Sequence, residues 1–157
     1  MATEKITDPR RVRHWPGHME TDYIYTLGLA GERFFNEIKE NGRIQGAKCK
    51  RCGNVFVPPR LYCERCFDKL TEWVNVGTKG VVHTFTVAYI DINGAKLQEP
   101  VIYALIKFKG TKGGLLHKLG EIEPHEVEIN MPVEALLKPQ TERTGNINDI
   151  RYFKPAK

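Results

Sequence analysis

The spacing of hydrophobic positions changes from helical to strand-like near residue 44. Between residues 27 and 41 apolar side chains recur every three or four positions, and charged side chains occupy most of the others. This spacing predicts an amphipathic helix, with Thr26 as its N-cap and Gly42 directly after its last turn. Further along, short apolar and β-branched runs alternate with Gly, Pro and Asn, a pattern typical of strands joined by turns.

The predicted strands form two groups, separated by a Gly-rich turn at residues 77–80. Three short strands belong to residues 44–76. The later group comprises the runs at 81–92, 101–108, 115–119, 127–129, 133–137 and 147–153. The run at 101–108 is apolar enough to predict burial on both faces. With the pieces at 127–129 and 133–137 taken together, about five strands with Gly-rich turns in a segment of this size favour a small barrel of the OB-fold type.

Four cysteines, the only ones in the chain, lie in the first group of strands. They form two Cys-x-x-Cys pairs, Cys49 with Cys52 and Cys63 with Cys66. Two such pairs supply four thiolates for one tetrahedral metal ion, and short strands between them are typical of a zinc ribbon. Because all four positions are filled by protein, we expect a structural Zn²⁺ site. Iron, as in rubredoxin, is the alternative metal and would indicate an electron carrier.

The predicted fold class is therefore mainly β with an N-terminal helix, in which a zinc ribbon is followed by an OB-fold barrel. We expect three segments: an N-terminal extension with the amphipathic helix (1–43), the Cys₄ zinc ribbon (44–76) and the OB-fold domain (77–157). Within the extension, Trp15 and Tyr23 are large aromatics that we expect to pack on a neighbouring domain or subunit.

Composition and charge narrow the function classes. The chain has 157 residues, of which 41% are hydrophobic and 27% charged, as in soluble globular domains. No apolar run is long enough to span a membrane, and the first residues lack the apolar core of a signal peptide, so we expect a cytoplasmic protein. The net charge of +5 is dispersed along the chain, which makes nucleic acid an unlikely partner.

The sequence has no motif of a known catalytic site. It lacks a nucleophile elbow, a phosphate-binding loop, a dinucleotide fingerprint and a zinc-protease motif. His83 and His117 lie in predicted strands and could each act as a general base, but neither has an evident nucleophile or carboxylate partner. We therefore interpret both histidines as structural and expect the chain to be non-catalytic on its own.

Several stretches together resemble a known family. They are Phe-Phe-Asn-Glu-Ile-Lys at 34–39, Gly-Ala-Lys-Cys-Lys-Arg-Cys-Gly at 46–53, Val-Pro-Pro-Arg-Leu-Tyr-Cys-Glu-Arg-Cys at 57–66, Gly-Val-Val-His-Thr-Phe-Thr-Val at 80–87, Pro-Val-Ile-Tyr-Ala-Leu-Ile at 100–106, and Gly-Gly-Leu-Leu at 113–116. Over roughly residues 30–153 the chain is similar to the DUF35 family. This resemblance implies a rubredoxin-like zinc ribbon followed by an OB-fold domain.

The resemblance also implies a function. Proteins of this kind are accessory subunits of thiolase-like condensing enzymes, in hetero-oligomers whose substrates are acyl-CoA. The implied settings are a benzoylsuccinyl-CoA thiolase of anaerobic toluene degradation, the bridging of a thiolase to hydroxymethylglutaryl-CoA synthase in the mevalonate pathway, and steroid side-chain degradation. The ribbon and helix would dock the partner, and the OB-fold domain would meet CoA.

A CoA site needs a few cations for the phosphates beside an apolar slot for the pantetheine arm. The candidate CoA- or partner-binding residues are the cations Arg60, Lys107, Lys112 and Lys118 and the apolar walls Phe34, Phe35, Phe85 and Tyr103. The alternative function is a single-stranded nucleic-acid-binding protein, because OB-folds grip single strands with aromatic and basic side chains.

Overall fold

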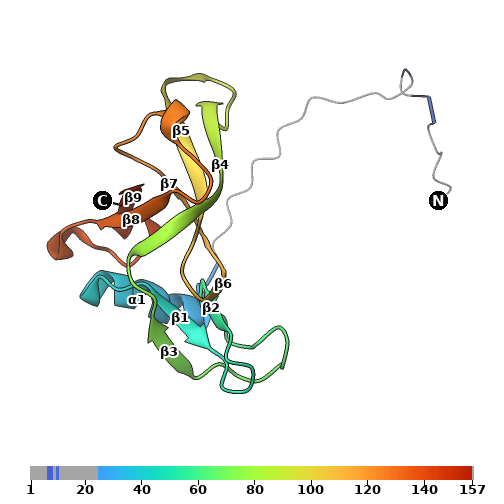
Figure 1. Ribbon diagram of the computed structural model, residues 1–157, viewed down its shortest axis with the longest axis vertical. Helices are drawn as coiled ribbons and strands as arrows, with labels where there is room; N and C mark the ends of the chain where they lie inside the picture. Colours follow the sequence, from blue (N-terminus) through green and yellow to red (C-terminus); the bar gives the residue numbers. More distant parts are fainter. Residues whose placement is uncertain (1–6, 9, 11–24, 157) are drawn as a thin grey trace.

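The structure, a computed structural model, describes residues 7–8, 10 and 25–156. The expected packing of Trp15 and Tyr23 lies outside these residues. Figure 1 shows a small sheet at one end, a larger curved sheet at the other, and one helix between them. None of the helices in the described part of the chain is long and apolar enough to cross a membrane.

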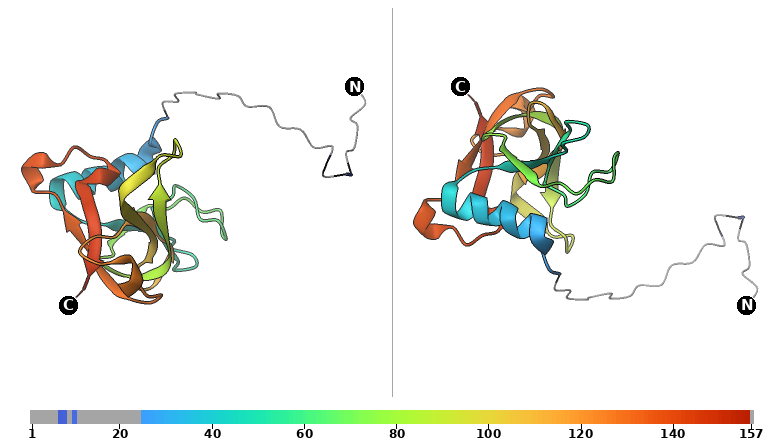
Figure 2. Two further views of the ribbon diagram at one scale, coloured as in Figure 1. Left: turned by 90° about the horizontal axis from the view of Figure 1, so that it is seen from above. Right: turned by 90° about the horizontal axis from the view of Figure 1, so that it is seen from below.

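Helix α1 (Gly28–Asn41) confirms the predicted amphipathic helix. Its buried side chains, Ala30, Phe34 and Ile38, are four residues apart and therefore lie on one face. Figure 2 shows this helix running along the side of the larger sheet. The prediction that Thr26 caps the helix is wrong: the helix begins one residue later than expected, so the N-cap position falls on Leu27, whose side chain makes no capping hydrogen bond.

The end of helix α1 follows the prediction. Gly42 has a φ of 62°, and its N–H donates to the carbonyl of Ile38 at 3.0 Å. A left-handed residue at this position favours glycine, which has no Cβ. A Cβ here would also lie 3.0 Å from a guanidinium nitrogen of Arg143, so that side chain would have to shift.

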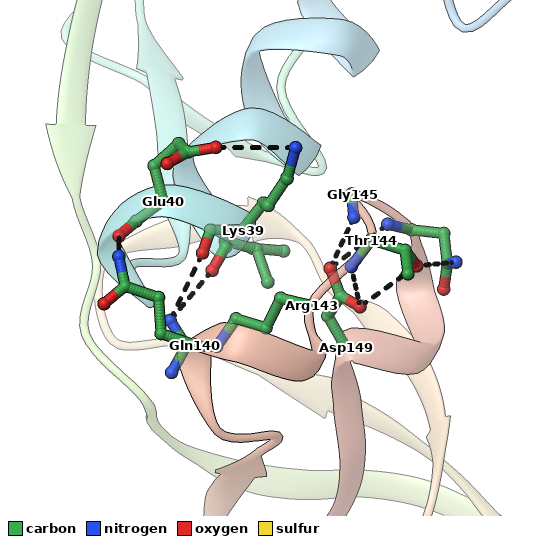
Figure 3. A network of polar contacts seen from close by, with 9 residues as sticks. Lys39, Glu40, Gln140, Arg143, Thr144, Gly145 and Asp149 are labelled. Carbon is green, nitrogen blue, oxygen red and sulfur yellow. Dashed lines mark hydrogen bonds and ion pairs between the residues drawn. The ribbon is translucent and has the colours of Figure 1, made fainter.

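Two side chains from far along the chain hold the last turn of α1 (Figure 3). Gln140 Nε2 donates to the carbonyl of Glu40 at 2.8 Å, and Arg143 Nη1 lies 3.4 Å from the carbonyls of both Ile38 and Lys39. The last carbonyls of a helix lack partners within it, although the Ile38 carbonyl also accepts the Gly42 N–H, and a cation is favourable at the negative end of the helix dipole. The loop at residues 138–149, which joins two strands of the larger sheet, therefore fixes the helix.

Asp149, in the same loop, is fully buried. Its carboxylate accepts hydrogen bonds from the N–H groups of Thr144 at 2.9 Å, Gly145 at 2.7 Å and Asn146 at 3.3 Å (Figure 3). Burial alone raises the pKa of Asp149, but these donors outweigh it and the net pKa is lowered from 3.8. The buried carboxylate thus organises the loop between η3 (Gln140–Glu142) and η4 (Ile147–Asp149).

We expect Asp149→Asn to lower the free energy of unfolding by about 2–3 kcal/mol at pH 7, because an amide cannot accept these hydrogen bonds in the same way. The lowered pKa means that the carboxylate stabilises the fold above pH 3.8, its unfolded value, and that this contribution is lost as the pH falls through the folded pKa. Urea unfolding at several pH values should show the gap to wild type closing below pH 3.8. Glu142→Gln, an exposed acid of the same loop, is the control and should change stability by less than about 0.5 kcal/mol.

The smaller sheet has the strand order β3-β1-β2-β6. Strands β1 (Gln45–Lys48), β2 (Val55–Val57) and β3 (Glu72–Asn75) correspond to the three predicted short strands. Strand β6 (Thr111–Gly113) comes from the segment after the Gly-rich turn and pairs with β2 in parallel. The sequence predicts only a turn there, because three residues with two glycines nearby carry no strand pattern.

Adjacent residues of β2 enter different cores. Phe56 packs with the cysteines, Ala47 and Leu70 in a small ribbon core. Val57 belongs to the main core of the larger sheet, as do Phe34 and Ile38 of the helix. Because successive strand residues point to opposite faces, β2 forms a wall common to both cores. The ribbon, the helix and the larger sheet are therefore packed as one unit.

The larger sheet has the order β7-β5-β4-β8-β9. Its long hairpin is formed by β4 (Lys79–Ile90) and β5 (Lys96–Lys107), and its other strands are β7 (Leu115–Lys118), β8 (Pro132–Leu137) and β9 (Ile150–Pro155). No ladder closes this sheet. Its two edges meet at a single parallel bridge between Leu119 and Phe153, where the N–H of Gly120 donates to the Phe153 carbonyl at 2.9 Å.

Three strand predictions need correction. Residues 127–129 form no strand: they follow η2 (Pro124–Glu126), and Val127 reaches the core from a loop. The last strand begins at Ile150, since residues 147–149 form η4 around the Asp149 carboxylate. Strand β5 is not buried on both faces. Ile102, Ala104 and Ile106 are buried, but Tyr103 between them is 42% exposed, because only one face of this sheet meets the core.

Candidate functional site

The four cysteines lie on two tight turns with the same backbone. In the first turn, the Gly53 N–H donates to the Cys49 carbonyl at 2.8 Å, and the Cys49 N–H donates to the Asn54 carbonyl at 2.8 Å. In the second, the Phe67 N–H donates to the Cys63 carbonyl at 2.9 Å, and the Cys63 N–H donates to the Asp68 carbonyl at 2.9 Å. We call them the first knuckle (49–54) and the second knuckle (63–68). Each presents two thiols to the same point.

The sulfur atoms have the geometry of a tetrahedral metal site. All four Sγ atoms lie within 4.8 Å of one another, and the Cys52 and Cys63 atoms are 3.7 Å apart. A zinc ion with Zn–S bonds of about 2.3 Å requires sulfur atoms about 3.8 Å apart. Cys49 and Cys63 are buried, and Cys52 and Cys66 are partly exposed. The donor set and its spacing fit a structural Zn²⁺ in a rubredoxin-like ribbon.

The thiols have different proton affinities when no metal is present. A hydrogen bond from the backbone of Asn54 lowers the pKa of Cys52 to about 7. Burial and the neighbouring thiols raise the pKa of Cys66 to about 12. Since metal binding requires thiolates, a metal ion entering this cluster displaces protons.

Three of the candidate apolar residues belong to the packing of the molecule. Phe34 is 2% exposed in the main core, and Phe35 stands against it at a centroid distance of 5.2 Å. Phe35 and Phe85 are partly buried and pack against the same core. The structure therefore gives Phe34 no surface for a ligand, and it packs Phe85 against the main core.

The candidate cations lie on different surfaces. Arg60 forms an ion pair with Glu64 and lies over the Phe56 ring, 5.3 Å from its centroid. Lys112, in β6, is opposite Phe56. Lys107, at the end of β5, is opposite Val81. Arg60 and Lys112 therefore both lie beside Phe56 of the ribbon, whereas Lys107 lies on the larger sheet.

Tyr103 and Lys118 are a candidate aromatic and a candidate cation that the structure brings together on an exposed surface. They are direct partners across β5 and β7, and both side chains are exposed. His117, which lies between Lys118 and Leu116 in β7, points inward instead. Its ring nitrogens lie 3.4 Å from the Lys118 carbonyl and 3.3 Å from the Ile147 carbonyl. His117 is thus a core residue, and His83 is exposed on β4.

Lys118 also lines a cleft that the sequence did not predict. This β5–β7 cleft has a volume of about 510 Å³ and lies between the start of β5, the loop after β7, and Tyr152. Its apolar lining is Pro100, Val101, Ile102, Leu119, Ile122 and Pro124, and its charged groups are Glu99, Lys118 and Glu123. No local motif could indicate it, because its walls come from three separate stretches that meet only in the folded chain.

Tyr152 is fixed at the edge of this cleft. Its hydroxyl donates to Glu121 Oε1 at 2.8 Å, and this hydrogen bond to the carboxylate raises the pKa of Tyr152. Polar and apolar surface line the cleft in about equal shares, and the polar groups include one cation, two carboxylates and a neutral phenol. Such a lining suits an uncharged chain better than a phosphate group.

Comparison with known proteins identifies both halves of the fold. Residues 37–72 match the ChsH2 rubredoxin-like zinc ribbon domain, and residues 73–138 match the ChsH2 C-terminal OB-fold domain. A DUF35 domain-containing scaffold protein of Methanocaldococcus jannaschii is 30% identical over 128 residues, which cover 78% of this chain and 89% of that protein.

Two further similarities bear on the family. The benzoylsuccinyl-CoA thiolase subunit BbsA of Geobacter metallireducens is 26% identical over 109 residues, covering 69% of this chain and 71% of that subunit. The crystal structure of a DUF35 protein of unknown function from Sulfolobus solfataricus superposes with a TM-score of 0.61 at 40% identity, covering 69% of this chain and 78% of that one. The chain belongs to the DUF35 family and carries its rubredoxin-like zinc ribbon followed by its OB-fold domain.

Proposed function

We propose that this chain is a non-catalytic, zinc-binding accessory subunit of a cytoplasmic thiolase-type acyl-CoA complex. The observation that carries the proposal is its similarity to proteins named as scaffolds and to one protein named as a thiolase subunit. Three archaeal relatives, 28–30% identical, are named scaffold proteins, and the Geobacter relative is named a thiolase subunit. Each is aligned over at least 68% of this chain.

The structure supports a scaffold role through its packing. Ribbon and barrel are joined by β2–β6 pairing, and helix α1 is fastened to the barrel by Gln140 and Arg143. Surfaces on the ribbon, the helix and the barrel are therefore presented in fixed relation to one another. A rigid body of this kind can bind a partner without the entropy cost of ordering its own parts.

We place the acyl or pantetheine part of the substrate in the β5–β7 cleft. Its apolar walls suit an extended chain with few charges, and Lys118 provides one cation beside it. The phosphates would then lie outside the cleft, where the partner subunit can contribute further cations. Candidate settings are toluene degradation through benzoylsuccinyl-CoA, the mevalonate pathway through hydroxymethylglutaryl-CoA synthase, and steroid side-chain degradation.

The nucleic-acid alternative has one structural observation in its favour. Tyr103 and Lys118 place an aromatic ring beside a cation on an exposed face of the OB-fold. Single-strand binding needs several such pairs along a groove. Among the described residues, the other candidate cations are too scattered to extend this pair.

The test is to isolate the tagged full chain from its own cells and identify what co-purifies in stoichiometric amount. We expect a thiolase-type enzyme, whose activity with its acyl-CoA should fall when the chain is removed. Ile122→Trp, which fills the β5–β7 cleft, should leave the complex intact and weaken acyl-CoA binding. Ile129→Trp, at an exposed position, is the matched control. Recovery of nucleic acid or ribosomal proteins instead would favour the alternative.

A further inference from the structure

The two knuckles have the same backbone hydrogen bonds, so their residues can be compared position by position. The informative difference is at the fifth position. The residue after the second cysteine is Gly53 in the first knuckle and Phe67 in the second. Both have left-handed backbone conformations, with φ of 73° at Gly53 and 58° at Phe67. The flanking hydrogen bonds are the same in both, as described above. The backbone conformation of the turn alone therefore favours glycine at this position, as at Gly53.

Phenylalanine at this position is unfavourable for the isolated chain. A side chain with a Cβ in the left-handed region costs about 1 kcal/mol or more relative to glycine. The Phe67 ring does not recover this cost by packing, because the residue is 80% exposed. Large aromatics at strained and exposed positions are typical of binding surfaces, where the ring is buried only in the complex.

The surroundings of Phe67 indicate what would cover it. With Arg51 and Arg65, the residue lines a shallow hollow of about 600 Å³ over Cys52 and Cys66. Arg51 lies 3.9 Å from Asp68, whereas no carboxylate in the described part of the chain pairs with Arg65. The hollow therefore has two arginine side chains around an unburied ring, and exposed Lys50 precedes Arg51 in the chain.

We propose that Phe67 is an anchor of the partner interface, inserted into an apolar pocket that carboxylates surround on the thiolase-type subunit. The proposal rests on the proposed function and specifies the surface that serves it. Arginines bordering a buried aromatic ring are a frequent composition of interface hot spots. The cations also offset the charge of a zinc tetrathiolate, so the partner's carboxylates would meet Arg65 and Lys50 rather than the metal site.

The test exchanges the two residues between the knuckles. A double variant, Gly53→Phe with Phe67→Gly, keeps the composition and the number of strained residues, and a Cβ at Gly53 meets nothing within 4 Å. Wild type, Phe67→Gly and the exchanged variant are each purified as full chains. Zinc content, thermal midpoint and the dissociation constant for the isolated thiolase-type partner are measured.

We expect one zinc per chain in all three proteins, with a thermal midpoint that is unchanged in the exchanged variant and unchanged or higher in Phe67→Gly. Affinity for the partner should fall roughly 30-fold in both variants, the effect of losing one hot-spot residue. Tyr89→Ala, which removes a 62% exposed aromatic from the β4–β5 hairpin, should retain wild-type affinity.

Two results would overturn the proposal. If both knuckle variants bind the partner as wild type does, Phe67 is not an anchor, although the accessory role stands. If wild type binds no thiolase-type protein but binds a single-stranded oligonucleotide, and Phe67→Gly abolishes that binding, the proposed function fails as well. Comparing wild type with the variants thus separates the two failures.

Discussion

Cys63→Ser is expected to abolish metal binding and unfold the ribbon, while the barrel retains its β structure. Cys63 is 1% exposed and lies at the centre of the ribbon core. Apart from the four cysteines, the described residues of that core are Ala47, Phe56, Leu70 and Trp73. So few apolar side chains cannot offset the entropy of ordering the ribbon, and we attribute its stability to the metal, whose binding is worth about 10–16 kcal/mol in small zinc domains.

The barrel should lose part of its stability without unfolding. It shares β2 with the ribbon, and Val57 of that strand belongs to the main core. Hydrogen exchange resolved along the chain is the measurement: amides of residues 45–75 should lose protection, whereas those of β4, β5 and β9 should keep it. Thr71→Ser, at an exposed ribbon position, is the control. A full equivalent of zinc and unchanged protection in Cys63→Ser would show that three thiolates suffice.

Gly113→Ala is expected to cause the second large loss, by separating the ribbon from the barrel. Gly113 pairs with Val57 in the parallel ladder between β6 and β2. Its φ is 83°, and a Cβ there would lie 2.4 Å from the Val57 carbonyl oxygen. The backbone cannot move away without breaking the ladder or displacing Val57 from the main core. We expect a loss of about 3 kcal/mol or more, from backbone strain and lost packing together.

Gly110→Ala is the matched control for this prediction. Gly110 lies on the same loop with a φ of 73°, but a Cβ there would meet nothing within 4 Å. Its replacement should therefore cost only the conformational term, about 1 kcal/mol. Denaturant unfolding of both variants gives the difference directly. Equal losses would mean that the contact with Val57 is unimportant and that the ribbon is held by other packing.

Features encoded by neighbouring residues were predictable from the sequence. The periodicity of Ala30, Phe34 and Ile38 gave the buried face of the helix, and Gly42 gave its end. The two Cys-x-x-Cys pairs were sufficient to predict the metal cluster, since tetrahedral coordination leaves little choice of arrangement. The two groups of strands predicted a ribbon followed by a barrel, the resemblance to the DUF35 family implied the same order, and the matching domain families confirm it.

Features that depend on distant residues were not predictable. Strand β6 is too short to carry a pattern and exists because β2 offers it a free edge. The β5–β7 cleft is formed by residues 99–102, 118–124 and Tyr152. Phe34 could be predicted to lie on the apolar face of the helix but not to be buried in the main core rather than at a ligand site. The contrast between Gly53 and Phe67 was visible in the sequence, but its significance required the φ angles.

The hydrogen bonds from Gln140 and Arg143 to helix α1 have a consequence for folding during synthesis of the chain. Gln140 and Arg143 hold carbonyls that precede them by 100 and 105 residues. During synthesis, therefore, the helix and both knuckles leave the ribosome long before the residues that fasten the helix exist. The knuckles can capture their metal at once, since all four thiols arrive together. Until the last part of the barrel has been translated, the helix is not fastened, and its apolar face is accessible to chaperones or to a partner subunit.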